Sequence, residues 1–153
     1  MTLKAVAEEQ SAIFAGGCFW CTESDFEKLD GVISAASGYI GGHLKNPTYK
    51  QVSSGGSGHT EAVEVIYDDQ IVSYSELVEY FWKTIDPTDG GGQFCDRGQQ
   101  YRSEIFYHDD AQRKLADAYL NFLYTPEAQA IIFKNFYRGW DTSKADPADV
   151  ARF

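Results

Sequence analysis

Two cysteines three residues apart carry the most reactive chemistry in the chain. They are Cys18 and Cys21, in the segment Gly16-Gly17-Cys18-Phe19-Trp20-Cys21. The apolar run 12–15 has the length of a buried strand, and apolar residues after the cysteines recur at helical spacing. Cys18 is therefore predicted at the first turn of a helix, where unpaired N–H groups and the helix dipole favour a thiolate. Cys21, one helical turn further on, would face the same side within reach of an oxidised Cys18.

A carboxyl group in a predicted strand could supply a proton to the reaction of such a thiol. In the strand expected over 61–68, Glu61 shares the more apolar face with Val63, Val65 and Tyr67. Burial disfavours a charged carboxylate, so we expect the pKa of Glu61 to rise and its side chain to hold a proton near neutral pH. On pattern alone, an exposed strand end is an equally good interpretation of Glu61.

Two glycine-rich segments, 41–60 and 90–101, contain most of the remaining unusual residues. Long loops without their own structure in compact domains are usually functional or disordered, and an aromatic residue among the glycines favours a shaped site. Strands carry such loops to one edge of a sheet. There, a thiolate would attack while a carboxyl group and phenols stabilise and protonate a departing oxygen. The residues expected at this edge are Cys18, Tyr49, Glu61, Asp96 and Tyr101, with Phe19 and Trp20 as an apolar wall.

Strands and helices alternate along the chain and must position these residues. The β-type runs cover 12–15, 32–40, 61–68 and 104–107. Helix starts are indicated at Ser73, Asp109 and Thr125. This order predicts one mixed sheet with helices packed against it. We expect a single catalytic domain over 1–153, with loosely ordered ends at 1–11 and 141–153.

Composition narrows the class of protein. The 153 residues are 43% hydrophobic and carry a net charge of −10, which fits one globular domain and argues against nucleic acid or an anionic membrane as partner. The apolar runs are too short to span a bilayer, and the start of the chain shows no signal peptide, so we expect a cytoplasmic protein. Three cysteines do not make a disulfide scaffold, and a Cys-x-x-Cys pair in a reducing compartment is typical of redox or metal chemistry.

Several short motifs, in matching order from about Ile13 to about Leu115, resemble those of the A-type peptide methionine sulfoxide reductases. The motifs are Gly17-Cys18-Phe19-Trp20, Gly38-Tyr39-Ile40-Gly41-Gly42, Asn46-Pro47-Thr48-Tyr49, Gly58-His59-Thr60-Glu61-Ala62-Val63, Asp86-Pro87 and Gln100-Tyr101-Arg102-Ser103. The resemblance implies a ferredoxin-like α+β fold, with helices packed on the sheet and long glycine-rich active-site loops. It also implies reduction of the S epimer of methionine sulfoxide, free or in peptides and proteins, as protein repair after oxidative damage, without metal or organic cofactor. We expect a monomer.

The family's roles carry over onto matching positions. Cys18 resembles the nucleophile that attacks the sulfoxide sulfur and becomes a sulfenic acid. Glu61 resembles the acid that protonates the sulfoxide oxygen, and Tyr49 and Tyr101 would hydrogen-bond that oxygen. The positions that match the family's apolar methyl pocket and its substrate-binding aspartate are Phe19, Trp20 and Asp96.

The chain also departs from the family in three places. The position after Phe-Trp is often glycine but is Cys21 here, which resembles the subgroup that resolves the sulfenic acid to a disulfide within the motif, for thioredoxin to reduce. Segment 93–97, Gln-Phe-Cys-Asp-Arg, differs from the commoner Asn-Asp form of that loop. The family's C-terminal Ala-Glu-x-Tyr-His-Gln segment and its C-terminal resolving cysteines are absent after Leu120. The last strand and one wall of the pocket therefore do not follow by analogy.

Three other classes of protein would use some of the same residues. A thioredoxin-like dithiol oxidoreductase would use Cys18 and Cys21 but would leave Glu61 and the tyrosine loops without a role. A cysteine hydrolase would pair Cys18 with His59. A zinc site would combine cysteines with a histidine, although a single Cys-x-x-Cys pair is a weak indication of one. Its candidate ligands are Cys18, Cys21, Cys95 and one of His43, His59 or His108.

Overall fold

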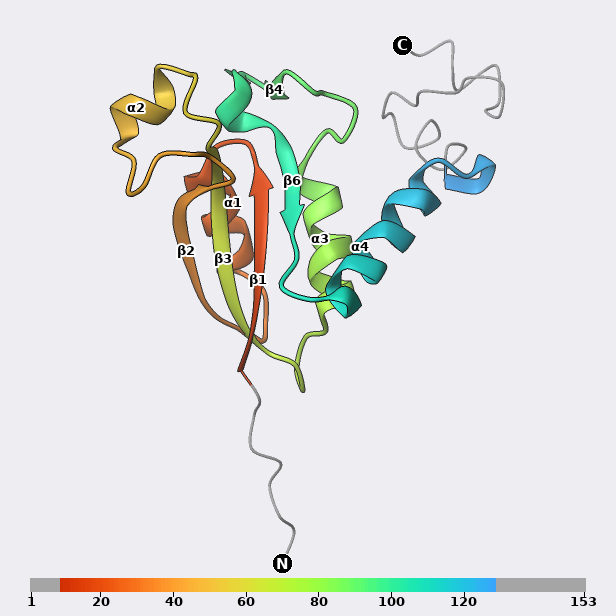
Figure 1. Ribbon diagram of the computed structural model, residues 1–153. Helices are drawn as coiled ribbons and strands as arrows, with labels where there is room; N and C mark the ends of the chain where they lie inside the picture. The colour runs from red at the N-terminus through yellow and green to blue at the C-terminus, as the bar shows by residue number, and fades with distance from the viewer. Residues whose placement is uncertain (1–8, 129–153) are drawn as a thin grey trace, which may run out of the picture. The chain divides into compact units, whose positions relative to one another are not determined.

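The computed structural model describes residues 9–128 (Figure 1). The chain divides into two compact units, Met1–Gln112 and Arg113–Phe153, and all the candidate site residues belong to the first. The single catalytic domain over residues 1–153 stays a prediction. The expected loose end at 141–153 lies outside the described residues.

Four strands of the first unit form one sheet. They are β1 (Glu9–Gly16), β2 (Val32–Ile40), β3 (Thr60–Asp68) and β6 (Ser103–Phe106). Their order is β2-β3-β1-β6, and all three neighbouring pairs are antiparallel. The predicted mixed pairing is therefore wrong for this sheet. Strands β1 and β2 run parallel to each other, but β3 lies between them. In the same way, β1 lies between the parallel strands β3 and β6.

Two split β-α-β units produce this arrangement. Helix α1 (Phe19–Phe26) joins β1 to β2 across β3, and helix α3 (Tyr74–Thr84) joins β3 to β6 across β1. This is the topology of a ferredoxin-like fold, so the predicted α+β fold class is confirmed. The ends of β1 and β2 and the starts of β3 and β6 consequently share one end of the sheet, the upper end in Figure 1.

Aromatic rings hold both helices against the sheet. The ring of Phe14, fully buried in β1, lies 4.8 Å from that of Phe26 in α1 and 5.1 Å from that of Phe81 in α3, measured between centroids. The ring of Tyr74, at the start of α3, lies 6.3 Å from Phe14. Because Phe14 contacts rings of both helices, it fixes the end of β1 from which the chain enters α1.

Strand β1 begins earlier than predicted. Residues 9–11, expected in a loosely ordered end, pair with residues 66–68 of β3. The side-chain amide of Gln112 also donates to the carbonyl of Ser11 at 2.7 Å. These polar residues are ordered because β3 extends to Asp68 and supplies backbone partners for them.

Side-chain caps begin two helices where the sequence predicts them. The Ser73 hydroxyl accepts from the N–H of Glu76 at 3.3 Å, and the Glu76 carboxylate accepts from the N–H of Ser73 at 2.8 Å. This is a capping box, and α3 follows it. At the start of α4 (Asp110–Leu123), the Asp109 carboxylate accepts from the N–H of Gln112 at 2.8 Å.

The two predicted glycine-rich loops contain short elements. Helix α2 (Tyr49–Ser53) lies between β2 and β3, so the expectation of a loop without structure of its own is wrong there. The segment between α3 and β6 contains a hairpin and a 3-10 helix. These elements are β4 (Gly92–Gln93), β5 (Asp96–Arg97) and η1 (Gln99–Tyr101). Both segments lie at the upper end of the sheet in Figure 1.

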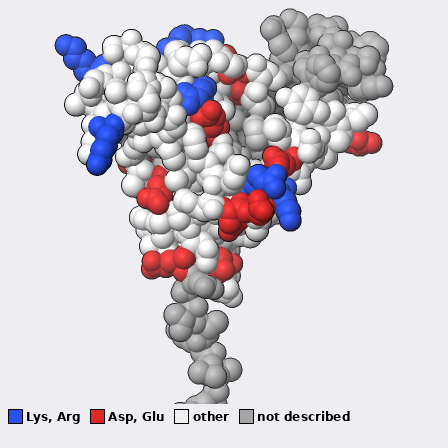
Figure 2. All heavy atoms as spheres, in the orientation of Figure 1, with Lys and Arg blue, Asp and Glu red and all other residues white. Residues whose placement is uncertain are grey.

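Charge is unevenly distributed over the face shown in Figure 2. Acidic side chains gather toward the end of the sheet opposite α2, where Glu9 of β1 pairs with Asp68 of β3. None of the helices in residues 9–128 has the length and apolar character that a bilayer crossing requires.

Candidate active site

The turn between β1 and α1 places Cys18 at the start of the helix, as the sequence predicted. Gly17 reverses the chain with a φ of 93°. Cys18 is the N-cap residue, and its side chain makes no capping hydrogen bond. Its carbonyl accepts from the N–H groups of Cys21 at 3.1 Å and Thr22 at 3.2 Å. The partly exposed thiol therefore lies at the positive end of the helix without serving as its cap.

The turn leaves no room for a side chain at Gly17. A Cβ atom there would lie 2.7 Å from the Cβ of Gln93 in β4. The buried amide of Gln93 donates to the carbonyls of Asp86 at 2.9 Å and Gly92 at 2.8 Å, and accepts from the N–H of Asp86 at 2.7 Å. Gln93 therefore anchors the β4–β5 hairpin against the turn that carries Cys18.

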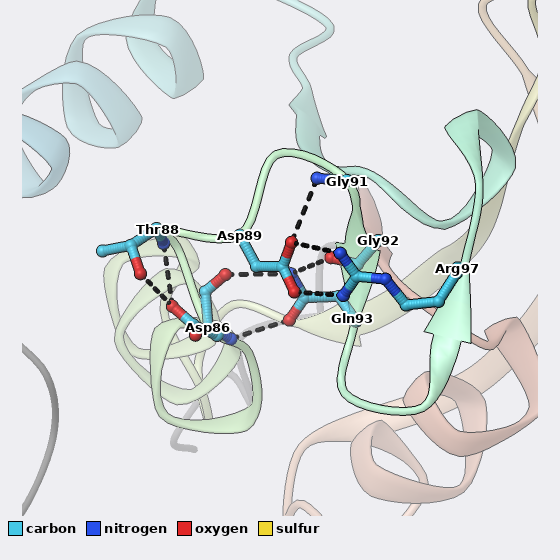
Figure 3. A network of polar contacts seen from close by, with 7 residues as sticks. All are labelled: Asp86, Thr88, Asp89, Gly91, Gly92, Gln93 and Arg97. Carbon is cyan, nitrogen blue, oxygen red and sulfur yellow. Dashed lines mark hydrogen bonds and ion pairs between the residues drawn. The ribbon is translucent and has the colours of Figure 1, made fainter.

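Figure 3 shows that charged residues brace the same hairpin. The Asp89 carboxylate accepts from both terminal nitrogens of the Arg97 guanidinium, with Nη2 to Oδ1 at 3.0 Å, and from the N–H of Gly91 at 3.0 Å. The Asp86 carboxylate accepts from the N–H of Thr88 at 2.9 Å and from its hydroxyl at 2.6 Å. The hydrogen bonds from Arg97 hold the pKa of Asp89 below its usual value. The ion pair fastens β5 to the segment that follows α3.

Glu61 is buried beside the reactive turn. It is 3% exposed, and its Oε2 accepts from the backbone N–H of Phe19 at 3.1 Å. Phe19 follows Cys18, so this bond ties the carboxyl group to the first residue of α1. Burial raises the pKa of Glu61, the Phe19 hydrogen bond opposes the rise, and the negative charge of Asp96 adds to it. The predicted burial and the direction of the pKa shift are both present in the structure.

The 3-10 helix η1 brings Tyr101 to the same place. The Thr60 hydroxyl, one residue before Glu61, donates to the carbonyl of Gln100 at 2.9 Å and so ties η1 to the start of β3. Burial raises the pKa of Tyr101, and the charges of Glu61 and Tyr49 raise it further. The phenol of Tyr101 is therefore protonated at neutral pH and able to donate a hydrogen bond.

Tyr49 reaches the site from α2. The helix begins with a capping box in which the Thr48 hydroxyl accepts from the N–H of Gln51 at 3.4 Å and the Gln51 side chain accepts from the N–H of Thr48 at 2.8 Å. Tyr49 is the first residue of this helix and is largely exposed. Its charge raises the pKa values of both Tyr39 and Tyr101, which indicates that the three phenols lie near one another.

An aromatic cluster covers one side of the turn. The ring of Phe19 lies 5.6 Å from that of Trp20 and 5.5 Å from that of Tyr39. Phe19 is buried, whereas Trp20 is 69% exposed. Tyr39 of β2 pairs directly across from Glu61 of β3. The structure thus provides an apolar surface that is partly open to solvent, and the substrate-binding roles of Phe19 and Trp20 stay predictions.

Cys21 and Asp96 complete the cluster. The pKa of Cys21 is raised by burial, then by a hydrogen bond to Cys18 and the charge of Cys18, and then by the charge of Asp96. The charge of Asp96 also acts on Glu61 and Tyr101. The structure therefore brings the predicted residues together from the β1–α1 turn, α1, α2, β3, β5 and η1, while their individual roles stay predictions.

Comparison with known proteins assigns this cluster to a family. A family model described as peptide methionine sulfoxide reductase matches residues 10–137. The chain belongs to this family. The resemblance that the motifs indicated is therefore confirmed.

Similar proteins and similar solved structures carry the name of the same family. The peptide methionine sulfoxide reductase MsrA of Streptococcus mutans is 58% identical over 108 residues, which are 71% of this chain and 64% of that protein. The chain thus spans less than two thirds of that relative's length. Methionine sulfoxide reductase A of Corynebacterium diphtheriae is 34% identical with a TM-score of 0.69, over 80% of this chain and 61% of that chain. Reduced Mxr1 from Saccharomyces cerevisiae is 31% identical with a TM-score of 0.71, over 79% of this chain and 71% of that chain.

Two alternatives to a methionine sulfoxide reductase lose support from the geometry. A hydrolase would need His59 as the base for Cys18. Nδ1 of His59 accepts from the N–H of Gly42 at 3.3 Å, so Nε2 carries the proton and donates to the carbonyl of Leu44 at 2.8 Å. Both ring nitrogens therefore bind backbone. A zinc site would need three or more ligands together, and residues 9–128 contain no such group of His, Cys, Asp and Glu side chains.

Sequence reasoning missed three residues that shape this site. Tyr39 lies within a family motif, and pairing its strand with β3 would have placed it beside Glu61. Gln93 is a long polar side chain within a glycine-rich loop, which is a weak sign of an internal anchor. Nothing in the sequence indicates that the Thr60 hydroxyl bonds a carbonyl 40 residues further along the chain.

Proposed function

We propose that this protein reduces the S epimer of methionine sulfoxide to methionine, free or within peptides and proteins, and so repairs proteins after oxidative damage. Family membership supports the reaction class, and the cluster around Cys18 supports the chemistry. Thiols supply both electrons, so the reaction needs no metal or organic cofactor. Thioredoxin would return the enzyme to its dithiol form.

In the first step, the Cys18 thiolate attacks the sulfoxide sulfur. Glu61 gives its proton to the sulfoxide oxygen, while Tyr49 and Tyr101 donate hydrogen bonds to that oxygen. The oxygen is transferred to the Cys18 sulfur, and methionine leaves with its sulfur reduced by two electrons. Cys18 is left as a sulfenic acid, oxidised by the same two electrons.

In the second step, the Cys21 thiol attacks the sulfenic sulfur, a disulfide forms and water leaves. Side chains one helical turn apart have Cβ atoms about 5–6 Å apart, whereas a disulfide brings them to about 3.5–4.5 Å. The first turn of α1 must therefore relax. Because Cys18 is an extended N-cap residue rather than part of the helix, rotating its backbone breaks few helical hydrogen bonds. A thioredoxin dithiol then exchanges with the exposed Cys21.

A single contact supports this function most directly, the hydrogen bond from the Phe19 N–H to Glu61. It places a buried acid next to the residue that follows the nucleophile. A plain dithiol oxidoreductase has no departing oxygen for such an acid to protonate. Protein disulfide exchange needs two thiols, whereas sulfoxide reduction must also protonate an oxygen.

The test is coupled turnover. NADPH oxidation is followed with thioredoxin, thioredoxin reductase and each epimer of a blocked methionine sulfoxide. We expect turnover with the S epimer alone, and none with Cys18→Ser enzyme, because serine is a poor substitute for a thiolate. Equal turnover of both epimers, activity that survives in a folded Cys18→Ser protein, or reduction of insulin disulfides in place of sulfoxide would contradict the proposal.

The proposal also includes a monomeric, cytoplasmic protein without nucleic-acid or membrane partners. The net charge of −10 supports the absence of nucleic-acid and anionic-membrane partners, because the phosphate groups of nucleic acids and of anionic lipids would repel such a surface. Light scattering after gel filtration tests the monomer, and fractionation of native cells tests the compartment.

A further inference from the structure

The tip of the β4–β5 hairpin has an unusual backbone. Gln93 pairs with Asp96, so Phe94 and Cys95 are the two residues of the turn. Phe94 has a φ of 50°, in the left-handed region that residues with a Cβ atom rarely adopt. Two-residue hairpin turns usually place glycine at their first position when its φ is positive, because glycine avoids the clash.

The fold gains little from a phenylalanine here. The Phe94 side chain is 69% exposed. The exposed ring contributes no packing to the core, and the left-handed backbone lowers stability, which glycine would avoid. Strained positions of this kind cluster at binding sites, where the side chain meets a ligand.

The residues on either side of Phe94 lie against the site. Gln93 packs on Gly17, which directly precedes Cys18. The charge of Asp96 acts on Cys21, Glu61 and Tyr101. Because consecutive Cα atoms are about 3.8 Å apart, Phe94 stands at the rim of the cluster, one residue from a contact with the reactive turn.

The base of the hairpin is rigid. The Gln93 side chain makes three hydrogen bonds there, and Arg97 is paired with Asp89 (Figure 3). A ring carried on a braced two-residue turn has little freedom to lose when a ligand covers it. Phe94 is therefore preorganised for contact.

We propose that Phe94 is a specificity residue that contacts the polypeptide on either side of an oxidised methionine and favours substrates with apolar neighbours. This inference rests on the proposed function. An apolar neighbouring side chain would cover the exposed ring and remove apolar surface from water. Free methionine sulfoxide carries no such side chain, and its charged amino and carboxylate groups gain nothing from an apolar ring.

The test compares two substrates in three variants. One substrate is a blocked methionine S-sulfoxide, and the other is a peptide with leucine on both sides of the same oxidised residue. Phe94→Gly removes the ring and the strain, and Phe94→Tyr keeps the ring. Ile71→Ala is the matched control, because Ile71 is exposed in the turn after β3, at the opposite end of the sheet from the site.

We expect Phe94→Gly to lower kcat/KM for the peptide roughly 5- to 20-fold, mainly through KM, as the loss of one apolar contact would. Its kcat/KM for the blocked amino acid should stay within about two-fold, and its melting temperature should equal or exceed that of the wild type. Phe94→Tyr and Ile71→Ala should leave both substrates unaffected.

An unchanged peptide kcat/KM in Phe94→Gly would overturn the inference. So would an equal loss for both substrates, because a disturbed site would affect both. Wild-type protein that turns over neither substrate would instead overturn the proposed function, and this inference with it.

Discussion

Glu61 is buried and accepts a hydrogen bond from the residue that follows Cys18. Its substitution should therefore affect the rate of the chemical step and the stability of the fold. Glu61→Gln keeps the shape and can still accept from the Phe19 N–H, but an amide cannot give up a proton. We expect binding to persist and the chemical step to slow by about 10²–10⁴-fold. Single-turnover release of methionine measures that step, and a rate equal to the wild type would remove the acid role from Glu61.

Glu61→Gln should also change how the melting temperature of the protein depends on pH. Burial raises the pKa of Glu61, so folding favours the neutral form. As pH rises above the unfolded value, the unfolded chain releases its proton before the folded one does, and wild-type stability falls. Glu61→Gln has no such loss. Its advantage in melting temperature over the wild type should therefore be larger at pH 8 than at pH 4, and an advantage independent of pH would contradict the shift.

The two remaining cysteines differ in their relation to Cys18. Cys21 lies one turn along the helix that follows Cys18, and Cys18 raises its pKa, whereas Cys95 lies in the turn of a separate hairpin. Cys21→Ser enzyme should release about one methionine per active site and then stall with thioredoxin as reductant, because the sulfenic acid lacks its resolving thiol. Cys95→Ser enzyme, the matched control, should keep turning over.

Peptide mapping of the oxidised wild type gives an independent check on the resolving thiol. We expect a Cys18–Cys21 disulfide. A Cys18–Cys95 link that forms first, or a stall in Cys95→Ser alone, would reverse the assignment.

For single residues, the sequence predicts which side chains could react but not the hydrogen bonds that hold them in position. Cys18 and Glu61 stand out because their types suit the chemistry and their neighbours predict a helix start and a strand. Their supporting contacts are long-range. The amide of Gln93, the hydroxyl of Thr60 and the locked ring of His59 each bond to backbone that is distant or in a loop, and no local pattern encodes such a bond.

Helix α3 carries a buried phenol whose removal should stabilise the protein. Tyr74 is 7% exposed, and its hydroxyl has no hydrogen-bond partner among the described residues. A buried polar group without a partner costs about 1–3 kcal/mol, so Tyr74→Phe should raise the free energy of unfolding by about 1 kcal/mol or more. Urea denaturation at pH 7 measures it, and a destabilised Tyr74→Phe would show that the hydroxyl is satisfied.

Tyr74 also predicts a response to alkaline pH. Burial raises its pKa to about 12. Between pH 10 and 12 the unfolded chain loses this proton while the folded chain largely keeps it, so the wild type should lose up to about 2 kcal/mol over that range on account of this group. Tyr74→Phe should lose correspondingly less, and parallel losses in the two proteins would contradict the assignment.

Helices and strands that are marked by patterns of neighbouring residues lie where the sequence predicts them. The capping box of α3, the Asp109 cap of α4 and the alternating strand β3 appear where side-chain type and spacing place them. The mixed sheet was wrong because alternating strands and helices do not reveal whether strands joined by a helix become neighbours. A strand inserted between them turns every pair antiparallel. Helix α2 was missed because its five residues are too short to show periodicity.

For the molecule as a whole, Phe14 is the residue on which both helices depend. Phe14→Ala removes ring contacts with α1 and α3 together and should cost about 3–5 kcal/mol of unfolding free energy. Ile33→Ala, at a half-exposed position of β2, is the matched control and should change it by less than about 1 kcal/mol. Chemical denaturation compares them, and a loss at Phe14 no larger than at Ile33 would mean that the rings do not hold the layers together.

The fold class could be predicted because six motifs in order specify a family whose topology is shared. The division of the chain into two units after Gln112 could not be predicted from the sequence. The helical pattern of α4 continues across that point without a break in composition, and the family's own C-terminal motif is missing there. A boundary that interrupts no local pattern leaves no trace in a single sequence.

The split arrangement of the sheet has a consequence for how the protein is made. β1 leaves the ribosome before its partners β3 and β6, and Phe14 pairs with Ile105 only after β6 is complete. Until then β1 has one open edge, and the turn that carries Cys18 lacks the loop that covers Gly17. Contacts so distant in sequence slow folding, because long loops must close before the contacts form. The nascent chain therefore carries the Cys18 thiol well before the residues that surround it in the folded protein are in place.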